Sequence, residues 1–113
     1  MSAPAPGRTE LPGIRYGQAW ESRDEVLGSI RYLVVSSDAY NLAFGDRRVI
    51  AVEIDSRAVY EGAYREPVVD AGTALLDRIV WVARSHLVEL VAELHPDRHA
   101  HVARVVRGLI GDL

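Results

Sequence analysis

The 113-residue chain contains no cysteine and no lysine, and all 13 of its basic residues are arginine. Without cysteine, a disulfide framework, a thiolate zinc site and a cysteine nucleophile are excluded. Without lysine, Schiff-base chemistry, a phosphate-loop lysine and the lysine of a common metal-dependent nuclease core are excluded as well. Composition alone therefore removes several enzyme classes.

Long apolar runs are also missing. No segment reaches the roughly 18 consecutive apolar residues that a membrane span requires. Residues 1–13 are rich in Pro, Gly and Ala and lack the apolar stretch of a signal peptide. We therefore predict a disordered tail over residues 1–13, one α+β domain over residues 14–113, and a cytoplasmic location.

Composition and charge are those of an ordinary globular domain. Apolar residues make up 49% of the chain and charged residues 26%, with a formal net charge of -3. A general binder of nucleic-acid backbones usually carries a basic excess, so this balance argues against that function.

The first predicted element is an N-terminal helix. Ser22 and Glu25 have the spacing of a capping box, and the apolar residues that follow recur at intervals of three and four. Residues 30–35 are rich in β-branched side chains, so a strand remains the alternative for that stretch.

A β-hairpin is predicted next. Residues 40–44 and 49–54 flank a four-residue connection with turn formers, and Ala58 to Tyr60 are typical of a third short strand. In the second strand, Ile50, Val52 and Ile54 are expected to face the core. Residues 61–72 contain Gly and Pro and indicate a loop.

The C-terminal half predicts an antiparallel helical hairpin. From residue 73 to residue 94, leucines and other apolar residues alternate at four- and three-residue spacing. His95-Pro96-Asp97 ends that helix and begins a last one, whose apolar stripe includes Val102, Val106 and Leu109. The predicted fold class is α+β: an N-terminal helix, a small antiparallel sheet and this helical hairpin packed against it.

Histidines and carboxylates are interpreted as structural. His95 and His99 lie four apart, a spacing that suits a metal on one helix face, but no completing ligand set is evident and we predict no metal or cofactor. His86 is interpreted as a hydrogen-bonded core histidine, with a catalytic base as the alternative. Glu53 and Asp55 share a strand face that we interpret as solvated, because the nuclease pattern they resemble also requires a lysine.

Aromatic residues are the predicted partner contacts. Helical phase places Trp81 on the polar side of the long helix, where a large aromatic often marks a contact with another chain. The alternative is that the segment around Tyr16 and Trp20 covers it. Tyr60, Tyr64 and Arg65 lie in the irregular segment before the predicted long helix, where loops often carry function, and they complete the partner-binding set.

We interpret the chain as a small non-enzymatic interaction module that self-associates as a homodimer or binds a protein partner, like an immunity protein or an antitoxin. Two alternatives stay open. A nucleic-acid-associated regulator would use Arg98, Arg104 and Arg107 on the last helix. A small-ligand enzyme would use a pocket near His86, with Tyr60 and Tyr64 in its wall.

Overall fold

The computed structural model describes residues 13–26 and 28–111. Its elements follow the order β1 (Gln18–Asp24), β2 (Gly28–Val34), α1 (Asp38–Phe44), β3 (Arg48–Asp55), β4 (Arg65–Val68), β5 (Gly72–Ala83), the 3-10 turn η1 (Arg84–His86), β6 (Leu87–Glu93) and α2 (Pro96–Ile110). The tail predicted over residues 1–13 lies outside the described residues except for Gly13.

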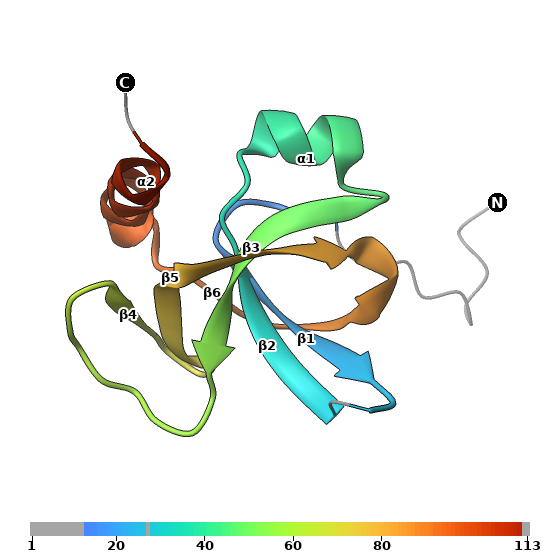
Figure 1. Ribbon diagram of the computed structural model, residues 1–113, viewed down its shortest axis with the longest axis horizontal. Coiled ribbons are helices and arrows are strands. Elements are labelled where there is room, and N and C mark those ends of the chain that lie inside the picture. Colours follow the sequence, from blue (N-terminus) through green and yellow to red (C-terminus); the bar gives the residue numbers. More distant parts are fainter. Residues whose placement is uncertain (1–12, 27, 112–113) are drawn as a thin grey trace, which may run out of the picture.

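The described strands form one six-stranded antiparallel sheet in the order β4-β5-β3-β2-β1-β6. The sheet bends strongly, with α1 above one end of it and α2 beside it (Figure 1). The first strand pairs with the last, while β3 lies near the centre with a neighbour on each side. This topology brings the ends of β2, β3 and β5 to one place on the surface.

Apolar side chains cover both faces of the bent sheet. The helix-side core, which α2 covers, includes Ala19, Leu33, Val52, Ile54, Leu76, Leu94, Val102 and Val106. The strand-side core, on the other face, contains Trp20, Val34, Val49, Ala51, Val82 and Leu87. Because residues alternate along a strand, β3 supplies Val52 and Ile54 to the first core and Val49 and Ala51 to the second.

Polar contacts fix α2 on the sheet. The carboxylate of Glu66 on β4 is buried and accepts two hydrogen bonds from Arg98, at 2.8 Å from Nε and 2.9 Å from Nη2. The hydroxyl of Tyr16 donates to the His99 carbonyl at 2.8 Å. A buried carboxylate is costly unless a cation and hydrogen bonds satisfy it, so Arg98 ties α2 to β4.

The predicted N-terminal helix is wrong, because this segment is a β-hairpin of β1 and β2. The Ser22 hydroxyl donates across the hairpin to the Ile30 carbonyl at 2.9 Å instead of capping a helix. The Asp24 carboxylate accepts from the Val26 amide, and Gly28 supplies the left-handed backbone that the turn needs. Residues 30–35, for which a strand is the alternative interpretation, are mostly in β2.

The predicted helix over residues 73–94 is also wrong, because β5, η1 and β6 occupy this range. Leu76 and Val80 lie four residues apart, yet Leu76 packs in the helix-side core and Val80 against the strand-side core. An irregularity in the pairing of β3 with β5 interrupts the strand alternation and so imitates a helical period.

The predicted fold class is therefore contradicted: no helical hairpin exists in residues 13–26 and 28–111, and the sheet dominates. Residues 40–44, predicted as a strand, lie in α1, whose N-cap Ser37 accepts from the Tyr40 amide. Ala58 to Tyr60 form no strand. The strand predicted over 49–54 and the last helix are confirmed as β3 and α2, although β3 is buried on both faces rather than one.

Within the described ranges, neither helix is long and apolar enough to cross a membrane.

We expect the helix-side core to dominate stability. Leu33 is fully buried and Leu42 is 89% exposed, so they form a matched pair of leucines. Leu33→Ala should lower the free energy of unfolding by about 2–5 kcal/mol, and Leu42→Ala by under about 0.5 kcal/mol. Urea denaturation of both variants measures the difference. Equal losses would mean that Leu33 does not lie in the core.

Candidate functional site

A polar groove opens where β2, β3 and β5 meet. Its volume is about 300 Å³, and its lining residues are Ser29, Ile30, Glu53, Ile54, Asp55, Ser56, Arg57, Leu75 and Arg78. Two carboxylates and two guanidinium groups face this small space. We call it the charged groove.

The alternation of β3 places both carboxylates in the charged groove. Val49 and Ala51 fill the strand-side core, and Glu53 and Asp55 follow on the same face, where that core ends. Apolar side chains thus give way to acidic ones along one face of one strand. Because the strand is central and its apolar half is buried, the acidic pair is held by a rigid element.

A bulge in β5 brings the second arginine to the groove. Val52 pairs with Ile79 and Ile54 with Ala74, so residues 75–78 of β5 stand opposite Glu53 alone. Extra residues of this kind bend a strand and redirect its side chains. Arg78 lies there with its Nη1 atom 3.6 Å from Oε1 of Glu53.

Asp55 and Arg57 form a second pair in the groove. Arg57 Nε lies 3.0 Å from Asp55 Oδ1, and Nη2 lies 3.3 Å from Oδ2. The Arg57 amide and the Tyr60 hydroxyl also donate to this carboxylate. Hydrogen bonds from Arg57 lower the pKa of Asp55 from 3.8 to about 2, so this carboxylate stays ionised and is a weak base.

A tyrosine on β2 lies against Glu53. Tyr32 pairs with Glu53 across the two strands. Burial, and next the nearby charge of Glu53, raise the pKa of Tyr32 above its ordinary value of 10.0. The phenol of Tyr32 therefore remains protonated at neutral pH, next to the Glu53 carboxylate.

We expect Asp55 to titrate near pH 2 in the folded protein. Its depressed pKa means that the pair with Arg57 stabilises the fold above about pH 4 and that this contribution is lost as the pH falls toward 2. Carbon-detected NMR titration of the Asp55 carboxyl measures the midpoint. Arg57→Gln should return it toward 3.8, and an unshifted midpoint in that variant would contradict the assigned cause.

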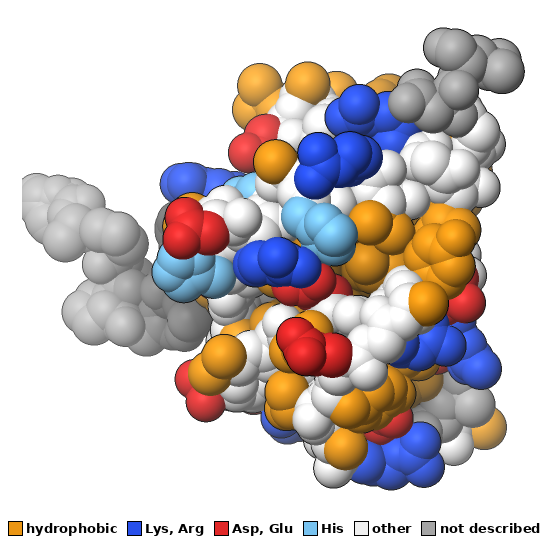
Figure 2. All heavy atoms as spheres, turned by 90° about the vertical axis from the view of Figure 1, so that its left-hand side faces the viewer, with side chains coloured by type: hydrophobic (Ala, Val, Ile, Leu, Met, Phe, Trp, Pro, Cys, Tyr) orange, Lys and Arg blue, Asp and Glu red, His pale blue; other side chains and the backbone are white. Residues whose placement is uncertain are grey.

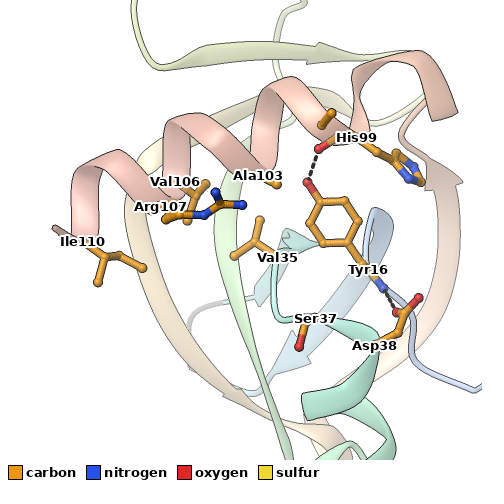
Figure 3. A pocket seen from close by; sticks show the side chains of 10 residues that line it. Tyr16, Val35, Ser37, Asp38, His99, Ala103, Val106, Arg107 and Ile110 are labelled. Atoms are coloured by element: carbon orange, nitrogen blue, oxygen red, sulfur yellow. Dashed lines mark hydrogen bonds between the residues drawn. The ribbon is translucent and has the colours of Figure 1, made fainter. Parts of the chain in front are cut away.

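A second hollow lies between α1 and α2 and is mainly apolar (Figure 3). Its volume is about 550 Å³, with Val35, Ala103, Val106 and Ile110 in its wall. Tyr16 closes one side, and burial raises the pKa of its hydroxyl to about 12. This groove has the size and lining of a binding site, but it lacks the paired charges of the charged groove.

Trp81 lies on β5, not on a helix, and is 72% exposed. Arg48 is placed between its ring and that of Phe44, with the guanidinium carbon 5.3 Å from each ring centre. Trp20 is fully buried and Tyr16 contacts α2, so the alternative that these two residues cover Trp81 is not what the structure shows. The predicted role of Trp81 as a partner contact stays a prediction.

Of the other predicted partner residues, Tyr60 and Tyr64 lie in the connection from β3 to β4, and Arg65 is the first residue of β4. Tyr60 borders the charged groove through its hydrogen bond to Asp55. Tyr64 has a left-handed backbone, and Arg65 donates both to the Tyr64 carbonyl and to Asp77. The structure therefore separates this group from Trp81, which sits on the other face of the sheet from the acidic pair.

Arginines of α2 do not form a uniform basic stripe. Arg98 is engaged by Glu66, while Arg104 and Arg107 are exposed. On the face that carries α2, arginine and histidine side chains are mixed with acidic and apolar ones (Figure 2). Nucleic-acid binding through Arg98, Arg104 and Arg107 stays a prediction.

Histidines lie apart from the charged groove. His86 is exposed in η1, not in a core as predicted. His95 caps α2 through its Nδ1 atom, and the His99 ring contacts the Leu94 carbonyl. Among the residues that the structure describes, no group of three or more His, Asp or Glu could hold a metal.

No protein-family description and no curated protein matches the sequence. Solved structures do match. An endoribonuclease in complex with its cognate antitoxin from a mycobacterial species aligns with a TM-score of 0.69 at 19% identity, over 88% of this chain and 97% of that chain. A MazE–MazF complex from Deinococcus radiodurans aligns with a TM-score of 0.64 at 26% identity, over 91% of this chain and 98% of that chain. MazF alone from that organism aligns with a TM-score of 0.63 at 24% identity, over 91% of this chain and 99% of that chain.

The chain has the fold of these structures. The interpretation as a non-enzymatic interaction module is overturned by this likeness, because the proteins that share the fold over nearly their whole length include endoribonucleases. A match to MazF alone and to an endoribonuclease alone shows that the likeness is to these chains rather than to their antitoxin partners.

The sequence alone indicates only part of the charged groove. Strand alternation places Glu53 and Asp55 on one face. Arg78, however, lies within the predicted long helix over residues 73–94, and Arg57 is predicted to be an ordinary surface residue. The available signal is the acidic end of an otherwise apolar strand, followed two residues later by arginine. The pairing of β3 with β5 completes the groove, and sequence spacing does not reveal that pairing.

Proposed function

We propose that the protein is an endoribonuclease that cleaves an RNA strand in the charged groove. The observation that carries this proposal is the coincidence of the fold with a groove of two arginines and two carboxylates. Arginine binds phosphate through paired hydrogen bonds, and carboxylates accept protons, so the groove holds both groups that phosphodiester cleavage uses.

The RNA supplies its own nucleophile in the proposed reaction. Glu53 removes the proton from a 2′ hydroxyl, whose oxygen then bonds to the adjacent phosphorus. The bond from phosphorus to the 5′ oxygen breaks, and that oxygen takes a proton from solvent. The products are a 2′,3′-cyclic phosphate and a 5′ hydroxyl. Arg57 and Arg78 neutralise the charge that develops on the phosphate oxygens.

Asp55 has a different role from Glu53. Its pKa of about 2 makes it a poor proton acceptor at neutral pH, whereas its four hydrogen-bond donors include the amide and the guanidinium of Arg57. Asp55 therefore positions Arg57. Without substrate, each arginine is neutralised by a carboxylate, and an RNA phosphate must replace that partner. The exposed pair of Arg57 is weak enough to allow the exchange.

We expect Arg78→Gln to lower kcat/KM for cleavage of a fluorescent RNA by roughly 100-fold or more, since it removes a charged donor to the phosphate. Arg47→Gln, in the exposed connection before β3, makes the same change in net charge outside the groove and should retain activity. An RNA with 2′-deoxyribose at the cleaved position should not be cut. Equal loss in both variants, or cleavage of the deoxy substrate, would contradict the proposed site or reaction.

A protein partner also fits this function. The mycobacterial endoribonuclease is bound to its cognate antitoxin. We extend this to the present chain and propose an antitoxin-type protein that contacts Tyr60, Tyr64 and Arg65. Because Tyr60 borders the charged groove, a partner at this connection would block entry of RNA. Action on cellular RNA agrees with the predicted cytoplasmic location.

Self-association is the second proposed contact. Trp81, Phe44 and Arg48 form an exposed aromatic–arginine cluster, the kind of residues enriched where binding energy is concentrated. We assign the predicted homodimer to this cluster.

Light scattering after size exclusion tests that assignment. We expect a dimer for the wild type, and Trp81→Ala should weaken it by at least roughly 30-fold in Kd, which corresponds to about 2 kcal/mol. Val88→Ala, at another exposed strand position, is the control and should leave the dimer intact. A wild-type monomer would reject the dimer, and an unaffected dimer would move the interface elsewhere.

A further inference from the structure

A second groove adjoins the charged groove. Its volume is about 330 Å³, and Arg31, Val59, Asp70 and Ala71 are among its lining residues. Ser56 and Arg57 line both grooves, so the two share one wall. We propose that this groove, the flanking groove, binds the nucleotide next to the cleaved bond, with Arg31 as the ligand of its phosphate. The inference rests on the proposed endoribonuclease function.

Arg31 is held in a fixed position by acceptors from two parts of the chain. Its Nε lies 3.3 Å from Glu21 Oε1 on β1. Its Nη1 donates to the Ala71 carbonyl at 3.0 Å and approaches the Asp70 carbonyl at 3.5 Å. A guanidinium fastened in this way loses little further freedom when it binds an anion.

The turn that supplies these carbonyls is itself constrained. Asp70 has a left-handed backbone with φ of 71°, and the Ala71 amide donates back to the Val68 carbonyl at 3.0 Å. Both carbonyls therefore occupy one side of Arg31. Within residues 13–26 and 28–111, the Nη2 atom has no hydrogen-bond partner, which leaves two N–H groups for an incoming phosphate.

Gly72 fixes the position of one groove relative to the other. Its φ is 131°, and a side chain at this position would collide with the Asp55 carbonyl. The start of β5 can therefore lie directly against the end of β3, which carries Asp55. The flanking groove, which contains Arg31, and the charged groove, which contains Asp55, are thus parts of one rigid unit.

The chemistry of the flanking groove suits a nucleotide better than a protein side chain. Arg31 offers paired donors to a phosphate, and the exposed side chain of Val59 offers an apolar contact for a sugar or base. Arg57 lies on the wall between the grooves, where a strand passing from one to the other must cross. Three arginines then follow consecutive phosphates along the strand.

Binding of non-cleavable 2′-O-methyl oligoribonucleotides of increasing length tests this path, with fluorescence anisotropy as the readout. In the wild type, one added nucleotide should tighten binding roughly tenfold when it fills the flanking groove. Arg31→Gln should remove that gain, leave the shorter oligonucleotide unaffected, and lower the salt dependence of log Kd by about 0.7.

The Val59→Glu variant controls for the possibility that Arg31→Gln weakens binding by disturbing the structure. Val59 is 60% exposed and takes no part in the hydrogen bonds that hold Arg31, so the substitution adds negative charge to the flanking groove and leaves Arg31 itself in place. It should also remove the gain. Ser85→Glu, outside both grooves, is the charge-matched control. Persistence of the gain in both groove variants would overturn the inference while leaving the proposed function intact. Failure of the wild type to bind any length would overturn both.

Discussion

Burial of β3 on both faces is the constraint on which the rest of the structure depends. Val49 and Ala51 fill one core, and Val52 and Ile54 fill the other. A strand fixed between two cores cannot slip in register without exposing one set and burying charges from the other. The position of Glu53, near the end of β3, is therefore as well determined as the two cores. The charged groove is rigid for the same reason.

The parts of the fold that sequence predicts are those with one unambiguous periodic signal. The last helix has a buried Val102 and Val106 with a cap and proline at its start, and its prediction is confirmed. The prediction over residues 73–94 is wrong, because a bulge makes apolar residues of two faces resemble one helical stripe. Tertiary pairing decides such cases, and sequence spacing alone carries no information about which strand lies opposite.

The candidate site shows the same division. The acidic pair on β3 follows from strand alternation, since residues two apart on a strand share a face, and this places Glu53 beside Asp55. Their arginine partners come from a turn and from a bulge, so the site exists only after β5 has paired with β3. The absence of lysine excludes one nuclease pattern, and in the charged groove arginine supplies the cationic groups beside the carboxylates.

Pairing of β1 with β6 joins the first and the last described strands, and the Leu94 amide also donates to the Gly17 carbonyl. During synthesis, β1 and β2 leave the ribosome long before β6 exists. The sheet therefore remains open on the β1 side until β6 has been synthesised, and α2 follows β6 in the sequence. Contacts so distant in sequence form slowly. Until β6 pairs with it, the backbone groups along one edge of β1 stay unpaired, so closure of this side of the sheet is a late step in folding.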